Sequence, residues 1–139
     1  MRRSAGVETI CQVIDILFQQ ETGAVLWHCE TGKDRTGLGT AFLLSLLGVE
    51  DRIIYEDYLR TNRYLAKDFL YMQRLLQTWP EADENMQRKL QTFYEVKEEY
   101  LRIVFEMIKL KYGSMEKFFQ EVFYLKPKMV EELRDKYLI

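Results

Sequence analysis

Residues 24–27, Ala-Val-Leu-Trp, are the one segment of the sequence with the continuous apolar run of a buried β-strand. Elsewhere apolar residues recur at every third or fourth position, which predicts amphipathic helices. A strand interior must give its backbone N–H and C=O groups to neighbouring strands. We therefore expect an α/β fold that is mostly helical, with a sheet that this chain alone leaves incomplete. The partner strands would come from a second copy, in a homo-oligomer or strand-exchanged dimer, or from an N-terminal portion.

The spacing of apolar residues predicts helices over residues 6–20, 36–47, 51–64 with a further stretch to about 78, 84–112, 114–123 and 127–138. Local signals mark several of their ends. Gly48 is expected to cap the second helix, Pro80 to stop the third, Ser114 to cap the short one, and Pro127 to begin the last. No repeat or flexible linker divides the chain, so we expect one domain over residues 1–139.

Composition limits the classes of function. Apolar residues make up 47% of the 139 residues, which is ordinary for a folded chain, and a net charge of −2 gives no field that would attract nucleic acid. The most apolar run, around residues 41–49, is far shorter than the ~20 residues that span a bilayer. Residues 1–3 are not followed by a signal-peptide core. We expect a cytoplasmic protein without stable membrane insertion.

The chain has two cysteines, Cys11 and Cys29, and a single histidine. Two cysteines make no disulfide framework, so reduced thiols are expected. Cys11 falls on the apolar stripe of the first helix, which favours a core position over a resolving thiol. A structural zinc site needs about four Cys, His or carboxylate ligands at suitable spacing, and this supply is too small. We expect neither a metal nor another cofactor.

The sequence HCETGKDRTG, at residues 28–37, lies between the predicted strand and the next helix. A cysteine acts as a nucleophile only as the thiolate, so its pKa of about 8.5 must be lowered by local positive potential. The free N–H groups and dipole of the following helix would favour both a Cys29 thiolate and a bound phosphate. Strand, loop and helix together predict an anion-binding site.

Arg35 follows the cysteine by six positions, and its planar guanidinium can hold two phosphate oxygens at once. Gly32 allows the backbone a tight approach, and Gly37 allows close packing at the start of the helix. Adjacent side chains of a strand point in opposite directions, so His28 is expected to orient the loop by hydrogen bonding and not to deprotonate Cys29. The residues expected to wrap the phosphate with backbone N–H groups are Glu30, Thr31, Gly32, Lys33 and Asp34.

Other interpretations of this motif are weaker. A cysteine and an arginine six positions apart arise often by chance, but the flanking histidine, Gly-Lys-Asp, Thr-Gly, strand and helix make coincidence improbable. A Walker A loop requires Ser or Thr after the lysine, and here Asp34 follows Lys33. A Cys–His hydrolase would need a second histidine, which the chain lacks.

The pattern H-C-x-x-G-K-D-R-T-G resembles the active-site loop of the protein tyrosine phosphatase superfamily, and Lys33-Asp34 within it resembles the atypical bacterial tyrosine and lipid phosphatases. Further segments are similar to the C-terminal part of that bacterial family: EYL at 99–101, KYGSM at 111–115 and VEELR at 130–134. The resemblance covers nearly the whole chain. It implies a tyrosine-phosphatase-like fold of which this chain is the C-terminal portion.

The resemblance also implies roles for the matching residues. Cys29 would form a phosphocysteine intermediate, Arg35 would grip the phosphate, and the Thr36 hydroxyl would help the thiol leave. Asp34 is the family's candidate proton donor, and Lys33 would contact the substrate phosphate and admit phosphoinositides beside phosphotyrosine. Glu30 would repel a phosphate dianion unless it faces solvent, so we expect it to point outward.

Three functions follow as hypotheses. The first is a cysteine-dependent phosphatase that hydrolyses phosphotyrosine or related phosphomonoesters, with phosphorylated proteins as substrates. The second is an inactive fragment or phosphate-binding interaction module, because relatives carry sheet strands before the helix at residues 6–20. The third is a phosphoinositide phosphatase.

Overall fold

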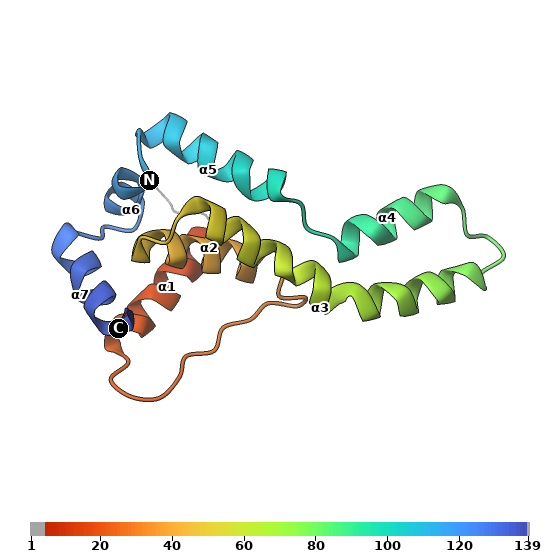
Figure 1. The fold of residues 1–139 in the computed structure, drawn as a ribbon, viewed down its shortest axis with the longest axis horizontal. Coiled ribbons are helices and arrows are strands. Elements are labelled where there is room, and N and C mark those ends of the chain that lie inside the picture. Colours follow the sequence, from red (N-terminus) through yellow and green to blue (C-terminus); the bar gives the residue numbers. More distant parts are fainter. Residues whose placement is uncertain (1–4, 139) are drawn as a thin grey trace.

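In the computed structural model, which describes residues 5–138, the chain folds into seven helices joined by loops (Figure 1). They are α1 (Ala5–Gln19), α2 (Arg35–Leu47), α3 (Asp51–Gln77), α4 (Glu84–Tyr94), α5 (Glu98–Tyr112), α6 (Met115–Val122) and α7 (Pro127–Tyr137). Residues 1–3, which bear on the expected lack of a signal peptide, lie outside the described residues.

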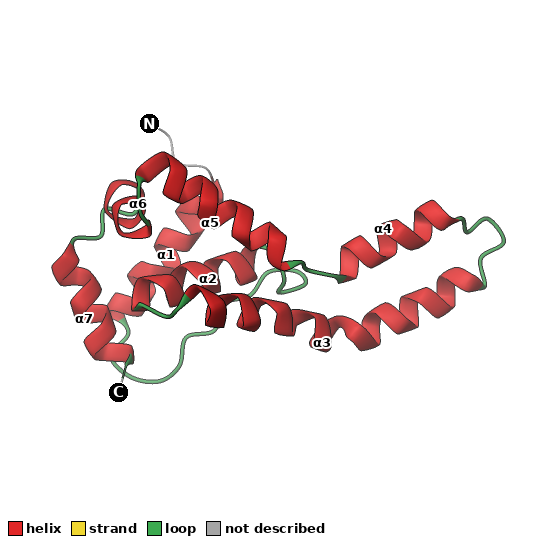
Figure 2. Cartoon of the chain, turned by 45° about the horizontal axis from the view of Figure 1, so that its top comes forward, coloured by secondary structure: helices red, strands yellow, loops and turns green. Residues whose placement is uncertain are grey.

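The β-strand expected at residues 24–27 does not form. Residues 5–138 contain no strand, and the chain between α1 and α2 is a long loop (Figure 2). Burial still alternates along it, since Val25 and Trp27 are half-buried while Leu26 is 88% exposed, as in an extended chain with one face against the body. A strand also requires a neighbour for its backbone groups, and none pairs with this segment. The predicted α/β class, with its incomplete sheet, is therefore wrong, and the described fold is helical.

The single helix expected over residues 84–112 is also wrong, because residues 95–97 are extended and separate α4 from α5. Val96, in the middle of this break, is only 1% exposed. Its N–H donates to Oδ1 of Asn62 at 2.8 Å, and its C=O accepts from Nδ2 of Asn62 at 2.9 Å. The side chain of Asn62 thus satisfies backbone groups that a continuous helix would have paired within itself.

The local signals for helix ends are confirmed. Gly48 caps α2 in the left-handed conformation with φ 89°, and Ser114 caps α6 by accepting a 3.2 Å hydrogen bond from the N–H of Lys117. Pro127 begins α7. The two stretches expected over residues 51–78 join into one helix, α3, which ends at Gln77 just before Trp79 and Pro80.

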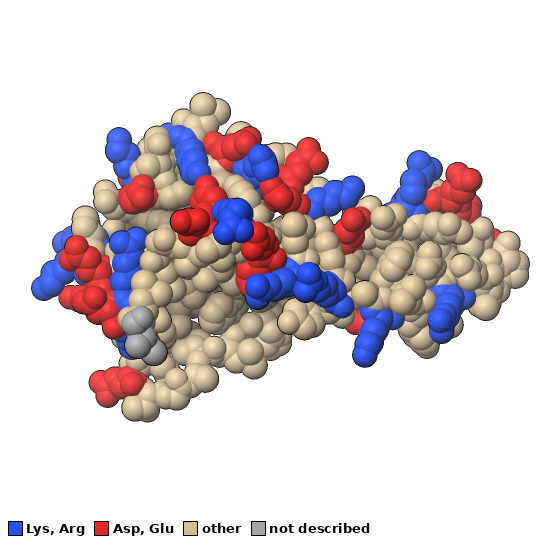
Figure 3. All heavy atoms as spheres, viewed as in Figure 1, with Lys and Arg blue, Asp and Glu red and all other residues tan. Residues whose placement is uncertain are grey.

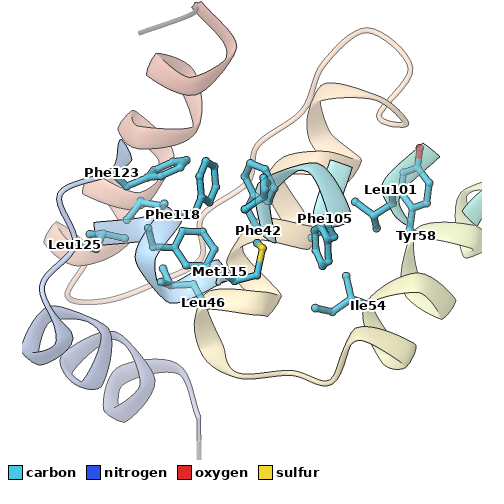
Figure 4. Packing of buried hydrophobic residues seen from close by; sticks show 14 of the residues in the cluster. Phe42, Leu46, Ile54, Tyr58, Leu101, Phe105, Met115, Phe118, Phe123 and Leu125 are labelled. Atoms are coloured by element: carbon cyan, nitrogen blue, oxygen red, sulfur yellow. The ribbon is translucent and has the colours of Figure 1, made fainter. Parts of the chain in front are cut away.

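Helix α2 is the centre of the packed body and contacts α1, α3, α6 and α7. Its Phe42 packs against four rings at centroid distances of 5.4–6.3 Å, as Figure 4 shows in part: Phe105, Phe118, Phe119 and Phe123. Side chains of helix α7 cap the carboxyl ends of two other helices. Arg134 donates to the C=O of Leu46 in α2, and Lys136 donates to the C=O of Leu17 in α1. These contacts fix the helix that carries the loop.

The far halves of α3 and α4 form a hairpin that projects from the body (Figures 1 and 2). Large apolar side chains remain exposed on it, including Tyr64 and Trp79. The accessible surface of the chain is 10354 Å², against about 7,700 Å² expected for a compact monomer of this mass. Within residues 5–138, neither α3 nor any other helix has the length and apolar content needed to cross a bilayer.

Candidate active site

Residues 28–37 form a loop that leads from the extended segment into the first turn of α2. Gly32 has φ +72°, a conformation that side chains disfavour. At Gly37 a Cβ would lie 2.9 Å from Cε2 of Tyr58, so only glycine lets the helix approach that ring. The tight turn and the close packing predicted for these two glycines are both present.

Cys29 is half-buried and its thiol is acidified by the loop. Partial burial by itself raises the pKa of the thiol. Hydrogen bonds from the Thr36 hydroxyl and from the backbone N–H groups of Thr36, Gly32 and Thr31 outweigh burial and lower the pKa of Cys29 to about 7. A substantial fraction of the sulfur is then thiolate at neutral pH.

Arg35 lines the same cavity as Cys29. Cys29, Arg35 and Thr36 line one cavity of about 320 Å³ between α1 and α2. The rest of its wall is mainly apolar, with Val7, Ile10, Val13, Trp27, Leu38 and Phe42 among the lining residues. Cys29 and Arg35, which are expected to act together, therefore border one shared pocket.

His28 and Glu30 flank Cys29 on the exposed side of the loop. His28 Nδ1 lies 3.2 Å from the C=O of Cys29, a distance at which the Nδ1–H tautomer donates a hydrogen bond. This contact with the loop backbone is consistent with the expectation that His28 orients the loop by hydrogen bonding. Glu30 points to solvent, as expected, and Thr31 is half-buried with its N–H directed at the sulfur of Cys29.

Asp34 precedes α2, and its side chain is 68% exposed. Its carboxylate lies 3.9 Å from Lys33 Nζ. Burial, together with the charge of Asp34, raises the pKa of Tyr58. The carboxyl group of Asp34 is largely accessible to solvent.

Lys33 lies against the carboxyl end of α4, and the contact with a substrate phosphate that the resemblance implies stays a prediction. Lys33 is only 8% exposed, and its Nζ donates to the C=O of Thr92 at 3.2 Å and lies 3.5 Å from the C=O of Glu95. Both carbonyls belong to the carboxyl end of α4. The ammonium group is therefore engaged by protein atoms, and Lys33 is not among the residues that line the pocket of Cys29 and Arg35.

Two residues of α3 that support the loop were missed from the sequence. Tyr58 packs on Gly37, and Asn62 binds the backbone of Val96. The sequence did contain a feature that could have identified them. The buried face of the helix carries residues at intervals of four, namely Ile54, Tyr58 and Asn62. A polar residue on such a face indicates a specific hydrogen bond.

The face in Figure 3 carries Lys and Arg interleaved with Asp and Glu, so no broad field of one sign covers it. Anion binding would depend on Arg35, the loop N–H groups and the start of α2. Within residues 5–138, no three His, Cys, Asp or Glu side chains gather closely enough to hold a metal ion.

Known proteins match this chain and its loop. A sequence model described as the tyrosine phosphatase family matches residues 2–139. A tyrosine-protein phosphatase of Nostoc commune is 44% identical over 54 residues, which are 39% of this chain and 18% of the relative. The triple specificity protein phosphatase PtpB of Mycobacterium tuberculosis is 31% identical over 100 residues, which are 66% of this chain and 36% of the relative. The matches thus span well under half of these curated relatives, but the family match covers almost every residue, and the chain belongs to the tyrosine phosphatase family.

Proposed function

We propose that this chain carries the catalytic loop of a cysteine-dependent phosphatase that hydrolyses phosphotyrosine or related phosphomonoesters. The observation that carries the proposal is the environment of Cys29. Its thiol has a pKa of about 7, held there by Thr36 and the loop N–H groups, and Cys29 lines one pocket together with Arg35. A nucleophile and an oxyanion clamp in one pocket are the minimum for this chemistry.

In the proposed reaction the Cys29 thiolate attacks phosphorus and the bond from phosphorus to the ester oxygen breaks. Arg35 and the loop N–H groups hold the three equatorial oxygens as their charge grows. The carboxyl group of Asp34 gives its proton to the leaving oxygen. Water then attacks the phosphocysteine and gives a proton to the carboxylate of Asp34, the phosphorus–sulfur bond breaks, and phosphate is released while Thr36 donates its hydrogen bond to the departing thiolate.

The proposed chemistry also indicates the cellular compartment and the substrate class. Neither Cys11 nor Cys29 is in a disulfide, and the nucleophile must stay reduced, so the proposal places the protein in the reducing cytoplasm with phosphorylated proteins as its substrates. The name of one relative, triple specificity phosphatase, describes that protein. For this chain we place phosphotyrosine before phosphoinositides, because the charge of Lys33 is already used on α4.

The test is hydrolysis of a generic aryl phosphate by pure protein. Turnover is expected in the wild type and in Cys11→Ala, since the side chain of Cys11 packs against the hydrophobic core, and is expected to vanish in Cys29→Ser. Turnover that survives in Cys29→Ser would rule out this nucleophile. A parallel comparison of phosphotyrosine peptide with phosphoinositide measures the proposed preference, and faster turnover of the lipid would reverse it.

A second candidate, a phosphate-binding module without turnover, is favoured by one observation. The segment that leads into Cys29 has an 88% exposed Leu26 and no strand beside it within residues 5–138, so part of the loop's support is open to solvent. This candidate predicts that inorganic phosphate binds while aryl phosphate stays intact. Any Cys29-dependent turnover would eliminate it.

A further inference from the structure

The buried ammonium group of Lys33 needs an explanation. Its side chain is 9% exposed, and the carboxylate of its neighbour Asp34 is 3.9 Å away and itself largely in solvent. A buried charge is costly unless it is paired or hydrogen-bonded. The contacts within hydrogen-bonding reach of its Nζ are the carbonyl groups of Thr92 and Glu95, and the Phe93 ring lies 5.6 Å from it.

These carbonyl groups sit at the carboxyl end of α4, where the last C=O groups of a helix lack intrahelical partners and carry partial negative charge. The ammonium group therefore acts as a C-terminal cap supplied by a distant loop. The chain uses the same device elsewhere, since Lys136 of α7 donates to the C=O of Leu17 and Phe18 at the end of α1. In the case of Lys33 the partner loop is the candidate active site.

A second hydrogen-bonded contact holds the same end of α4. Immediately after Glu95, the backbone of Val96 is paired on both sides by the carboxamide of Asn62. Residues 92–96 are thus fixed to the phosphate loop, residues 28–37, through Lys33 and to α3 through Asn62. Movement of this segment would pull on Lys33 and on the residue before it, Gly32, whose N–H points at the sulfur of Cys29.

We propose that Lys33 is a positioning residue: it anchors the phosphate loop to the carboxyl end of α4, so that the docked α3–α4 hairpin holds the loop N–H groups in the arrangement that binds an oxyanion. This deepens the proposed function and rests on it for the role of the loop, but the anchoring itself is a property of the folded chain.

The direct test is acylation of lysines by an amine-reactive acetyl ester, with each lysine followed by peptide mass spectrometry in the wild-type protein without any anion. Lys33 is expected to react at least about tenfold more slowly than the exposed Lys67, because it is released only by local opening. Inorganic phosphate should change its rate little. Equal rates for the two lysines, or protection that arises only with phosphate, would overturn the proposal.

The second test uses a change that removes no charge. Asn62→Leu should loosen residues 92–96, speed the acylation of Lys33 and raise the pKa of Cys29 above about 7, measured as the pH dependence of thiol alkylation. Asn85→Leu, an exposed position in the first turn of α4, is the matched control and should change neither value. If the pKa of Cys29 and the acylation rate are the same in Asn62→Leu as in the wild type, the coupling is absent.

Lys33→Met distinguishes two ways in which Lys33 could affect the pKa of Cys29: by anchoring the loop, or directly through its charge. In the Asn62→Leu background, Lys33→Met should raise the pKa of Cys29 by less than it does in the wild type, because both substitutions release the same segment, residues 92–96. Additive shifts would instead mean that the charge of Lys33 acts on the thiol by itself. Should Asn62→Leu fail to fold, the wild-type acylation still decides the matter. None of these readouts requires turnover, so an inactive protein would defeat the proposed function without touching this inference.

Discussion

The ring of Tyr58 lies so close to Gly37 that a Cβ on residue 37 would be 2.9 Å from Cε2 and 3.1 Å from Cδ2. Tyr58 belongs to the buried face of α3, while Gly37 lies in the first turn of α2, directly after the phosphate loop. The distance between the two helices at the site therefore depends on a missing methyl group. The position of the loop N–H groups depends on the same contact.

Gly37→Ala is expected to destabilise the protein. Forcing a methyl group against a buried ring costs about 1–3 kcal/mol, more than the roughly 1 kcal/mol that alanine gains over glycine in a helix. The loop should also be displaced, so affinity for inorganic phosphate should fall. Urea unfolding gives the free energy and a phosphate titration gives the affinity.

Gly39→Ala is the matched control in the same helix. A Cβ there would meet its nearest atom, on Ile10, at 3.8 Å, which is ordinary contact. This variant should be more stable than the wild type by up to about 1 kcal/mol. If the two alanine variants change stability alike, the close contact with Tyr58 has no energetic consequence.

Thr36→Val is expected to raise the pKa of Cys29. The Thr36 hydroxyl is the largest of the contributions that lower this pKa to about 7, and valine keeps the shape while removing the hydroxyl. The thiolate is lost as pH falls through the pKa, so the variant should be alkylated more slowly than the wild type near pH 7. The two rates should converge well above the ordinary pKa of about 8.5.

Alkylation rates of Cys29 from pH 5 to pH 10 measure this shift directly. Thr40→Val, one turn further along α2, serves as the control and should leave the profile in place. An unchanged profile in Thr36→Val would show that the backbone N–H groups alone acidify the thiol.

Much of the helical pattern could be predicted because its signals are local. Gly48, Ser114 and Pro127 mark helix ends through their own backbone preferences, whatever surrounds them. The strand at residues 24–27 could not be settled this way, since an apolar run predicts an extended chain while a strand also needs a neighbour. The break at Val96 was invisible for a related reason: it is stabilised by Asn62, 34 positions away.

In the candidate site too, features that depend on neighbouring residues could be predicted from the sequence, whereas contacts with distant residues could not. Residues 28–37 are adjacent in sequence, so the shared pocket of Cys29 and Arg35, the turn at Gly32 and the outward Glu30 could all be anticipated from the motif. The partners of Lys33 could not, because they are backbone carbonyl groups about 60 positions away, and a carbonyl group leaves no trace in residue type.

Asn62→Leu is expected to lower the stability of the whole chain by about 1–3 kcal/mol, since it leaves the N–H and C=O of Val96 without partners in a partly buried place. Urea unfolding of the variant beside Asn85→Leu measures the difference. The control, on an exposed turn, should stay within about 0.5 kcal/mol of the wild type. A loss no greater than that of the control would mean that water replaces Asn62 at the break.

The central claim, that Cys29 and Arg35 hold one oxyanion between them, is tested most directly by protection of Cys29 from alkylation by inorganic phosphate. In the wild type, saturating phosphate should slow the reaction of Cys29. In Arg35→Lys, which keeps the charge but loses the planar fork, the phosphate concentration that gives half protection should rise at least about tenfold, equivalent to about 1.4 kcal/mol. A wild-type Cys29 that phosphate does not protect, or protection equal in the two proteins, would contradict the account.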